Sequence, residues 1–550
     1  MTFPISNGSL LQRLLLDPTR RDRVTHVEHV PARVGRRADW PVWVPPLLID
    51  RLALQGVPAP WEHQAQAADL ARGGQSVVIA TGTASGKSLA YLLPVLSELL
   101  DDEKATGLYL APTKALATDQ LRAVRALNLT QVRAATFDGD TSYEDRDWVR
   151  RFGTYVLTNP DMLHRSVLPR HADFSRFLRG LRYVVVDECH TYRGVFGSHV
   201  AQVLRRLRRV CARYGASPVF LLASATVSEP EVSASRLVGL PVIPVSDDAS
   251  PRGTTEFALW EPPLQKDYAG RGSGENGAPV RRSATAETGD LLADLVVEGA
   301  RTIAFVRSRR GAEAVAVNAR RAVTEAEPSL GARIAAYRSG YLPEERRELE
   351  KRLQSGDLLG VAATNALELG VDVAGLDAVV LSGWPGTVAS VWQQAGRAGR
   401  AGQGALAVFV ARDDPLDTYL VHHPAALFGR AVEATVLDPS NPYVLGPHLC
   451  CAAAELPLTD DDLALFPGAE EVLPDLVRRG LLRHRPKGWF WTSRERPDAD
   501  LRGAGGPPVR LVEAETGRLL GTVDHSSSHA QAHTGAVYLH QGESYVVEQL

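Results

Sequence analysis

The sequence predicts an α/β protein with two tandem lobes, each built on a parallel sheet, followed by a small module of helices and a hairpin and by a β-rich C-terminal segment. Short apolar runs alternate with stretches of helical periodicity in two separate blocks, as buried parallel strands with crossover helices do. A segment rich in Gly, Ser and Pro, residues 246–290, lies between the blocks. The length of 550 residues is enough for about three to five domains of roughly 100 to 200 residues each.

The composition is that of an ordinary globular protein. Hydrophobic residues make up 44% and charged residues 23% of the chain, and no run of about 18 apolar residues is long enough to cross a membrane. No basic stretch precedes a long apolar core at the N-terminus, and the 4 cysteines form no C-x-x-C pair. We therefore expect a cytoplasmic protein with reduced thiols and no membrane partner. The net charge of −3 neither supports nor excludes binding to nucleic acid, because an acidic protein can have a local basic groove.

The predicted strands follow the apolar runs in chain order. In the first lobe they are residues 74–80, 107–111, 154–158, 182–188 and 219–225, and in the second lobe 301–306, 333–337, 358–364, 378–383 and 404–411. We expect an N-terminal extension at 1–55, lobe 1 at 56–245, a flexible linker at 246–290 and lobe 2 at 291–435.

The segments after lobe 2 have a different character. Within residues 436–500, short helical patterns run into two β-like pieces across the turn Pro486-Lys487-Gly488, an order typical of a winged helix. Residues 501–550 alternate like two hairpins, and we expect them to be the start of a domain that is cut short.

A phosphate-binding loop follows the first predicted strand. The stretch Thr81-Gly82-Thr83-Ala84-Ser85-Gly86-Lys87-Ser88 lies between that strand and a helical pattern. In this setting backbone N–H groups and the helix N-terminus hold phosphate oxygens, Lys87 reaches the β and γ phosphates, and the Ser88 hydroxyl is a Mg²⁺ ligand. Thr81 stands where the strict pattern has Gly, and an ordinary Gly-Ser turn is the alternative. We predict that Gly82, Thr83, Gly86, Lys87 and Ser88 bind ATP.

An acidic motif ends the predicted strand 182–188. Asp187-Glu188-Cys189-His190 follows an apolar run, so Asp187 can hold Mg²⁺ and Glu188 can deprotonate the attacking water. Alone, this motif is also compatible with a solvated acidic turn. Together with the phosphate-binding loop it predicts hydrolysis of a nucleoside triphosphate, with Asp187, Glu188 and His190 in the catalytic site.

With both motifs in place, residues 60–411 resemble superfamily 2 helicases of the DExH type, which have two RecA-like lobes and use ATP and Mg²⁺. Pro60-Trp61-Glu62-His63-Gln64 resembles the Q motif, in which Gln64 would read adenine; a helix-surface glutamine is the alternative. Motifs Ia and Ib imply contacts to the sugar-phosphate backbone from Thr113, Lys114, Thr158 and Asn159. Ser224-Ala225-Thr226 resembles motif III, in which Ser224 and Thr226 would couple the nucleotide site to the nucleic-acid site.

The second lobe continues the resemblance. Phe305-Val306-Arg307 resembles motif IV and 363–372 resembles motif V, which implies that Arg307 and Thr364 contact nucleic acid and that Gly370 and Asp372 contact the nucleotide. Residues 393–400 resemble motif VI, with Gln393 beside two arginine fingers, Arg397 and Arg400. Such a finger typically accounts for about 10³ to 10⁵ in rate, so hydrolysis would depend on closure of the lobes.

Several phrases, among them 187–209, 337–350 and 533–550, are similar to the MrfA/SftH group of bacterial DNA-repair helicases. That resemblance implies translocation from 3′ to 5′ on single-stranded or tailed DNA. The group's longer members carry a four-cysteine zinc site, whose cysteines this sequence lacks, so we expect no zinc. We expect a monomer. Two alternatives stay open: an ATPase that acts on RNA or remodels nucleoprotein without unwinding, and a non-catalytic ATP-dependent clamp.

Four groups of residues can be interpreted either as structural or as functional. His525, His529, His533 and His540 favour a loop over a metal site, and His448 with Cys450 and Cys451 favours a buried helix face. The arginines of 205–213 favour a solvated helix surface over a DNA contact. The basic and aromatic residues of 478–491 are equally compatible with DNA binding and with packing against the lobes.

Overall fold

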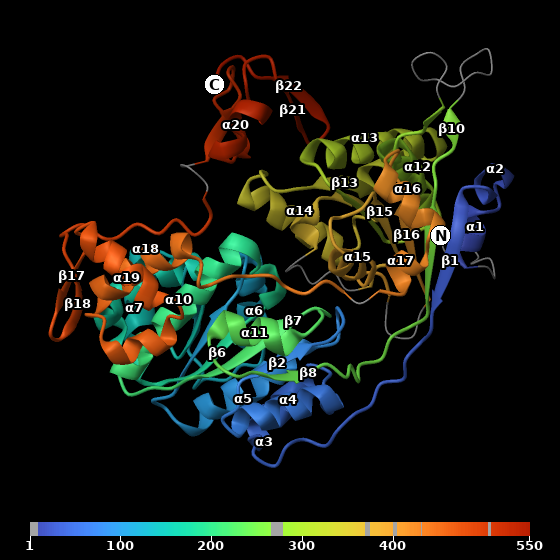
Figure 1. Ribbon diagram of the computed structural model, residues 1–550. Helices are drawn as coiled ribbons and strands as arrows, with labels where there is room; N and C mark the ends of the chain where they lie inside the picture. The colour runs from blue at the N-terminus through green and yellow to red at the C-terminus, as the bar shows by residue number, and fades with distance from the viewer. Residues whose placement is uncertain (1–8, 266–278, 369–374, 400–403, 431, 504–507) are drawn as a thin grey trace. The chain divides into compact units, whose positions relative to one another are not determined.

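The computed structural model describes residues 9–265, 279–368, 375–399, 404–430, 432–503 and 508–550. These residues form two compact units that do not follow the order of the chain. One unit contains residues 36–250 and 433–503, so it joins lobe 1 to the predicted winged helix (Figure 1). The other contains the described residues of 1–35, 251–432 and 504–550, so it joins lobe 2 to the two terminal segments.

Lobe 1 is a seven-stranded sheet in which every pair is parallel. Its strands, in spatial order, are β4 (Ala134–Thr136), β5 (Tyr155–Thr158), β3 (Thr106–Leu110), β6 (Leu181–Val186), β7 (Val219–Ser224), β2 (Val77–Ala80) and β8 (Ile243–Val245). Alternate side chains of a strand face opposite cores: along β3, Leu108 and Leu110 enter one apolar cluster and Tyr109 enters the other. The parallel sheet predicted for this lobe is confirmed.

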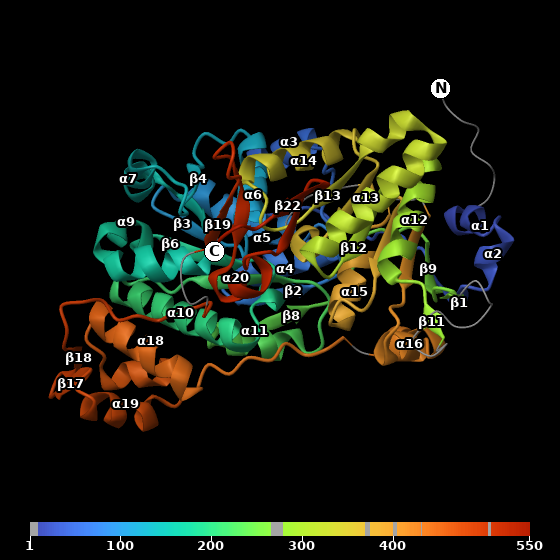
Figure 2. The same ribbon diagram turned by 90° about the horizontal axis from the view of Figure 1, so that it is seen from above.

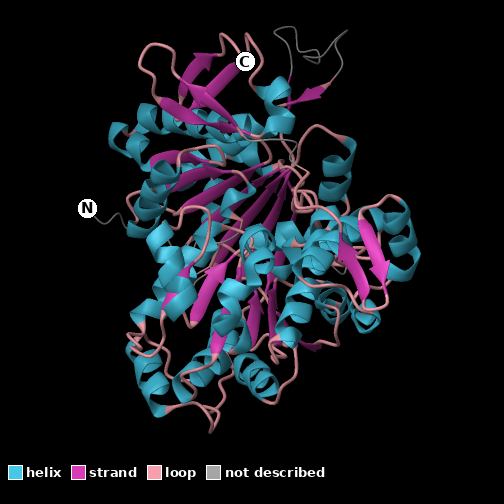
Figure 3. Ribbon diagram, turned by 90° about the vertical axis from the view of Figure 1, so that its left-hand side faces the viewer, coloured by secondary structure: helices cyan, strands magenta, loops and turns pink. Residues whose placement is uncertain are grey.

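Helices cover both faces of the lobe 1 sheet (Figure 3). One core includes side chains of α3 (Pro46–Leu54), α4 (Glu62–Arg72), α5 (Lys87–Asp101) and α6 (Lys114–Ala126). The other includes side chains of α7 (Tyr143–Phe152), α9 (Ser175–Arg179), α10 (Gly194–Arg213) and α11 (Pro230–Val238). Between β5 and α9 the chain forms the short helix α8 (Pro160–Met162), a π-helical turn at Leu163–Val167 and a 3₁₀ segment at Leu168–Phe174.

Lobe 2 is also built on a seven-stranded sheet. Its strands, in spatial order, are β1 (Val24–Val30), β9 (Thr255–Trp260), β16 (Ala405–Val410), β15 (Ala378–Ser382), β12 (Thr302–Val306), β14 (Gly360–Ala363) and β13 (Ile334–Tyr337). Only β1, at one edge, is antiparallel to its neighbour. One core gathers side chains of α1 (Leu10–Leu14), α12 (Ala284–Val297) and α13 (Arg309–Ala326), and the other those of α14 (Pro343–Ser355), α15 (Val388–Ala395), α16 (Pro415–His422) and α17 (Ala425–Phe428).

Two segments differ from their expected roles. Residues 246–290 were expected to be a flexible linker, yet β9 lies in the lobe 2 sheet between β1 and β16, because the stretch Phe257–Trp260 is fully buried. The average composition of the segment hides this short strand. The expected N-terminal extension is shared between the units: α1, α2 (Pro18–Arg21) and β1 belong to lobe 2, whereas α3 packs in lobe 1. Short strands β10 (Leu264–Gln265) and β11 (Val280–Arg281) form a separate pair.

The module after lobe 2 has the order predicted for a winged helix. It contains α18 (Pro442–Glu455), a 3₁₀ turn at Asp460–Leu465, α19 (Ala469–Arg478) and the hairpin of β17 (Leu482–Arg485) and β18 (Gly488–Trp491). Gly488 has a φ of 118°, and a Cβ there would lie 1.8 Å from the carbonyl oxygen of Leu458. Only glycine fits at this point, where the hairpin meets the chain that leaves α18.

The arginines of α10 correct another prediction. A solvated surface was favoured for residues 205–213, but Arg205, Arg206 and Arg209 are buried, because α10 packs against both α11 and α18 of the winged helix (Figure 2). The guanidinium of Arg205 donates to carbonyl oxygens of α11. The Arg206 guanidinium forms an ion pair with Glu455. Arg209 donates to the carbonyl oxygens of Ala452 and Leu456 at 2.8 and 2.9 Å. Arg206 and Arg209 therefore hold the winged helix on lobe 1.

Buried histidines surround the same ion pair. Arg206 Nη1 donates to Nδ1 of His164 at 2.8 Å and to Nδ1 of His448 at 3.1 Å. Burial, and next the charge of Arg206, lowers the pKa of His164 to about 3 and that of His448 well below its usual range. Both rings are therefore neutral acceptors at neutral pH. The interpretation of His448 with Cys450 and Cys451 as a buried face of a helix agrees with their positions in α18.

The C-terminal segment is a pair of hairpins with a helix between them. The elements are β19 (Val509–Val512), β20 (Leu519–Val523), α20 (His525–Gln531), β21 (Val537–His540) and β22 (Glu543–Val546). The loop expected at His525–His533 is largely the helix α20: Ser528 Oγ bonds back to the carbonyl of His525 at 2.8 Å, and Ser528 is buried. Among the described residues, no group of three or more His, Cys, Asp and Glu side chains is placed to hold a metal ion.

Candidate functional site

The phosphate-binding loop connects β2 to α5. Gly86, the residue before α5, has a φ of 78°, and a Cβ there would lie 2.5 Å from Nε2 of Gln64. Ala84 has a φ of 59°, a left-handed conformation that is strained for a residue with a Cβ. The ammonium of Lys87 donates to the carbonyl oxygens of Thr81 and Gly82 at 3.2 and 2.8 Å. Lys87 is thus folded over the loop that is predicted to hold phosphates.

Gln64 braces the end of this loop. Its side chain is buried, Oε1 accepts from the backbone N–H of Trp61 at 2.7 Å, and Nε2 donates to the carbonyl of Gly86 at 2.8 Å. The alternative of a helix-surface glutamine is therefore wrong. The role in reading adenine stays a prediction, because the amide contacts the phosphate-binding loop itself in this structure.

Asp187 and Glu188 lie directly after β6. Asp187 is buried, and Oδ2 accepts from the hydroxyls of Tyr109 at 2.5 Å and Tyr91 at 3.2 Å. Burial, and next the charge of Glu188, raises the pKa of Asp187 to about 6. The Tyr91 hydroxyl also lies 3.2 Å from Oγ of Ser88. One tyrosine thus links the two oxygens that are predicted to hold Mg²⁺.

His190 connects the acidic motif to motif III. The backbone N–H of Ala225 donates to Nδ1 of His190 at 3.2 Å. Burial, and next the charge of Lys87, lowers the pKa of His190 to about 4, so its ring is neutral at neutral pH. The contact of 3.5 Å between Nδ1 and a carboxylate oxygen of Glu188 is therefore no ion pair at that pH. The donor in this link is the backbone N–H of Ala225, so the side-chain pattern of the sequence could not reveal it. Ser224 and Thr226 are the residues on either side of Ala225.

The predicted nucleic-acid residues of lobe 1 follow β3 and β5. Thr113 caps α6 by accepting from the N–H of Leu116 at 3.3 Å, and the half-exposed ammonium of Lys114 contacts Asp140 at 2.7 Å. Asn159 is partly exposed and accepts from the N–H of Met162 at 2.9 Å. Thr158 is buried, and its hydroxyl donates to the carbonyl of Phe137. The side chain of Thr158 is therefore occupied inside the lobe, and we place no nucleic-acid contact on it.

In lobe 2, Arg307 is exposed directly after β12, whereas Thr364 is buried directly after β14. The Arg397 guanidinium donates to the carbonyl of Glu368 at 2.6 Å, and the amide of Gln394 donates to the Glu368 carboxylate at 3.0 Å. Glu368 therefore joins motifs V and VI, a role that the sequence reasoning missed. Gln393 is buried in α15. Gly370, Asp372 and Arg400 lie outside the described residues.

Three family models match successive parts of the chain. The DEAD/DEAH box helicase model matches residues 61–234, and the helicase conserved C-terminal domain model matches residues 287–402. The winged helix domain of the ATP-dependent helicase HRQ1 matches residues 437–502, which confirms the winged helix predicted here. None of the helices in the described part of the chain combines the length and hydrophobicity that a bilayer crossing needs.

The chain is 39% identical to the uncharacterized ATP-dependent helicase YprA of Bacillus subtilis over 549 residues, which are 98% of this chain and 72% of YprA. It is 35% identical to the ATP-dependent helicase HRQ1 of Saccharomyces cerevisiae, of which it covers 46%. A crystal structure of the helicase MrfA bound to DNA and AMPPNP superposes with a TM-score of 0.91 at 39% identity, over 99% of this chain and 75% of that one. The chain therefore belongs to the MrfA group of superfamily 2 ATP-dependent helicases.

Proposed function

We propose that this protein is an ATP-dependent DNA helicase that moves from 3′ to 5′ along single-stranded DNA, separates duplexes and acts in DNA repair. The observation that carries the proposal is the Tyr91 hydroxyl, which lies 3.2 Å from both Ser88 Oγ and Asp187 Oδ2 and so gathers the parts of an ATP site. The MrfA structure of the same group holds DNA and AMPPNP together, which supports DNA as the nucleic acid. The direction and the repair role rest on the sequence resemblance.

The residues of lobe 1 suit ATP and Mg²⁺. A hydroxyl and a carboxylate are ligands that Mg²⁺ accepts, so Ser88 and Asp187 would hold it, and the ion would neutralise charge on the β and γ phosphates. The N-terminus of α5 presents backbone N–H groups to the phosphates, and Lys87 would exchange the carbonyls of Thr81 and Gly82 for phosphate oxygens. Glu188 would orient and deprotonate the attacking water.

Closure of the lobes would complete the site. Arg397 and Arg400 would reach the γ phosphate as arginine fingers, with Gln393 beside them, and Gly370 and Asp372 would contact the nucleotide. Each closure and reopening would shift the grip of one lobe along the DNA. We propose that Thr113, Lys114, Asn159 and Arg307 contact sugar and phosphate, so binding should show little sequence preference and a strong dependence on salt.

The first test compares ATP hydrolysis without nucleic acid, with single-stranded DNA and with single-stranded RNA. Lys87→Ala is the control, since it removes the ammonium that would meet the phosphates. Stimulation by DNA, lost in the variant, supports the proposal. Stimulation by RNA alone, or by neither polymer, would refute it and favour an RNA-directed ATPase.

A strand-displacement assay tests the direction of movement, and a survival assay in cells tests the role in DNA repair. Duplexes with a 3′ tail should be unwound and matched duplexes with a 5′ tail should not; the reverse preference would contradict the assigned polarity. Cells that lack the gene should survive DNA damage less well than cells that carry it, and equal survival would remove the repair role. We propose that the helicase acts as a monomer, which sedimentation with and without DNA would check.

A further inference from the structure

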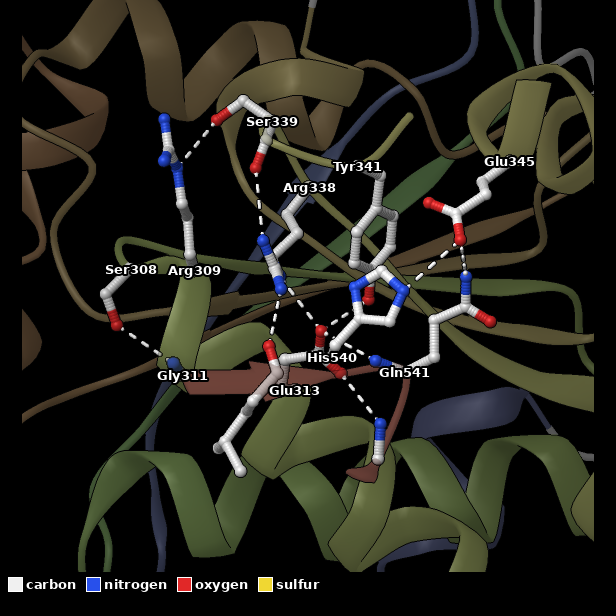
Figure 4. A network of polar contacts seen from close by, with 12 residues as sticks. Ser308, Arg309, Gly311, Glu313, Arg338, Ser339, Tyr341, Glu345, His540 and Gln541 are labelled. Atoms are coloured by element: carbon white, nitrogen blue, oxygen red, sulfur yellow. Dashed lines mark hydrogen bonds and ion pairs between the residues drawn. The ribbon is translucent and has the colours of Figure 1, made fainter. Parts of the chain in front are cut away.

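The C-terminal hairpin of β21 and β22 ends in a turn that binds a carboxylate of lobe 2. Gln541 and Gly542, at the centre of the turn, have φ values of 50° and 94°. Two successive positive φ values are typical of a primed hairpin turn, and they direct neighbouring backbone N–H groups to the same side. These N–H groups donate to Oε1 and Oε2 of Glu313, on α13, at 3.1 and 3.2 Å (Figure 4).

Glu313 belongs to a buried ion pair. Its Oε1 accepts from Nε of Arg338 at 2.9 Å, and both side chains are 1% exposed. Nη2 of Arg338 donates to the carbonyl of Leu539 in the hairpin at 2.5 Å, and the guanidinium lies 4.4 Å from the ring of Tyr341 and 5.1 Å from that of Tyr538. A buried ion pair is stable only when its remaining donors and acceptors are satisfied. Here the backbone of the C-terminal hairpin supplies two donors and one acceptor.

A second carboxylate holds the same turn. Oε1 of Glu345 lies 3.2 Å from Nε2 of His540, which is 4% exposed, and 3.0 Å from Nε2 of Gln541. Oε2 of Glu345 accepts from the N–H of Leu342 at 3.0 Å, which caps the first turn of α14. The hairpin is therefore attached to the residues that start α14.

The other hairpin contacts the loop just before α14. The N–H of Thr522 on β20 donates to the carbonyl of Gly340 at 3.1 Å. A Cβ on Gly521 would lie 2.2 Å from that carbonyl oxygen, so glycine is required for the close approach. Arg309 spans the contact: its Nε donates to Oγ of Ser339 at 3.1 Å, and its Nη2 lies 3.3 Å from the carboxylate of Asp524. Both hairpins thus contact the loop of residues 338–342.

This loop lies at the edge of lobe 2 where nucleic-acid contacts are proposed. It follows β13, and β12, β14 and β13 are adjacent parallel strands, so their carboxyl ends share one edge of the sheet. Arg307 follows β12, two residues before Arg309, and the N–H of Thr364 after β14 donates to the carbonyl of Tyr337 at 3.2 Å.

We propose that the two C-terminal hairpins position the nucleic-acid grip of lobe 2 without belonging to it, and that Glu313 and Arg338 fix the hairpins there. The two hairpins hold the loop 338–342 and Arg309, and through Arg309 they fix the start of α13, where Arg307 meets sugar and phosphate. This inference rests on the proposed function, because it assumes that Arg307 contacts nucleic acid.

Gly521→Val tests the proposal without changing a lobe 2 residue. The added side chain pushes β20 away from Gly340, while Ala514→Val introduces valine at an exposed position of the same hairpin. In Gly521→Val, the single-stranded DNA concentration for half-maximal ATPase should rise about tenfold, the scale of one lost charge-assisted contact. Basal ATPase and the KM for ATP should stay at wild-type values. Ala514→Val should match the wild type throughout.

Arg307→Ala, alone and combined with Gly521→Val, separates positioning from a general structural role. If the hairpins act by placing Arg307, the two changes raise the half-saturating DNA concentration less than the product of their separate effects. Multiplicative effects would overturn the proposal, as would a wild-type response of Gly521→Val to DNA. If Gly521→Val does not fold, Gln541→Ala, which removes only the side-chain contact to Glu345, takes its place with a smaller shift expected. A wild-type ATPase that no nucleic acid stimulates would instead refute the proposed function.

Discussion

The ion pair between Arg206 and Glu455 should control how firmly the winged helix is attached to lobe 1. The partners come from α10 and α18, with side chains 1% and 2% exposed. We consider Arg206→Met, Glu455→Gln and the double variant. Methionine keeps much of the length of arginine without its charge, and glutamine keeps an acceptor while losing the carboxylate charge.

The expected magnitudes follow from the burial of the pair. Removing one partner of a buried ion pair typically costs about 3 to 5 kcal/mol, because the other charge stays buried and unpaired. Arg206→Met also takes a donor from the Nδ1 atoms of His164 and His448, so we expect it to lie at the upper end of that range. The double variant leaves no unpaired charge, and its cost should be about 1 to 3 kcal/mol. The coupling free energy in the cycle should therefore exceed about 3 kcal/mol.

Hydrogen exchange of the α18 amides is the suitable assay, because a chain of several modules does not unfold in one step. The free energy of opening should fall in α18 for each single variant and largely recover in the double variant. The amides of β6 serve as an internal control and should keep their protection. Single variants within about 1 kcal/mol of wild type, or a double variant as destabilised as the sum of the singles, would refute the reasoning.

Four further outcomes are expected. Gln64→Ala should raise the KM for ATP and for GTP alike if its amide only braces Gly86, and should raise the KM for ATP alone if it reads adenine. Ala84→Gly should stabilise the protein by about 1 kcal/mol in thermal melting by relieving a φ of 59°. Gly488→Ala should loosen the winged helix in limited proteolysis, because its Cβ would lie 1.8 Å from a carbonyl oxygen. Acid should weaken the attachment of α18 to lobe 1. Below about pH 6.5 His164 is protonated when it is exposed but stays neutral when it is buried, so the free energy that holds α18 in place should fall by about 2 kcal/mol at pH 5.

Gly488→Ala and the acid response each have a matched control variant. Gly480→Ala changes another glycine of positive φ, 73°, that has no atom within 4 Å of its missing Cβ, so it should be much milder than Gly488→Ala. His164→Asn keeps an acceptor for Arg206 and cannot be protonated, so it should reduce the loss of protection between pH 7.5 and 5. An unchanged acid response in that variant would assign the response to other groups. A lower melting temperature for Ala84→Gly would show that chain entropy outweighs the backbone strain.

The sequence predicts the lobes well because their strands are buried on both faces. Runs such as 183–186 and 405–411 are continuous and apolar, so the parallel sheets could be expected without a structure. β9 was missed because six strand residues stand in a segment whose average composition is that of a loop. The chain pairing that places β9 between β1 and β16 joins residues far apart in sequence, and no local pattern encodes it.

The site shows the same limit. The phosphate-binding loop and the acidic motif are local and were predicted residue by residue, whereas the tyrosines that contact Asp187 come from α5 and β3 and carry no motif. An arginine in a helical pattern is expected to be solvated. The burial of Arg206 could not be predicted from the sequence, because it depends on the packing of α18 against α10. Thr158 matched its motif by position, but its hydroxyl bonds inside the lobe.

The division of the chain into units decides what a deletion can test. In the sequence, residues 440–550 are a tail whose removal should separate hydrolysis from strand displacement. In the structure, that tail covers α10 on lobe 1 and the loop 338–342 on lobe 2, and it supplies partners to Arg206 and to Glu313. Its removal would expose apolar surface on one lobe and strip donors from a buried carboxylate on the other. Loss of ATPase in such a deletion would therefore report damage to both lobes, whereas point changes that leave both lobes covered can distinguish hydrolysis from unwinding.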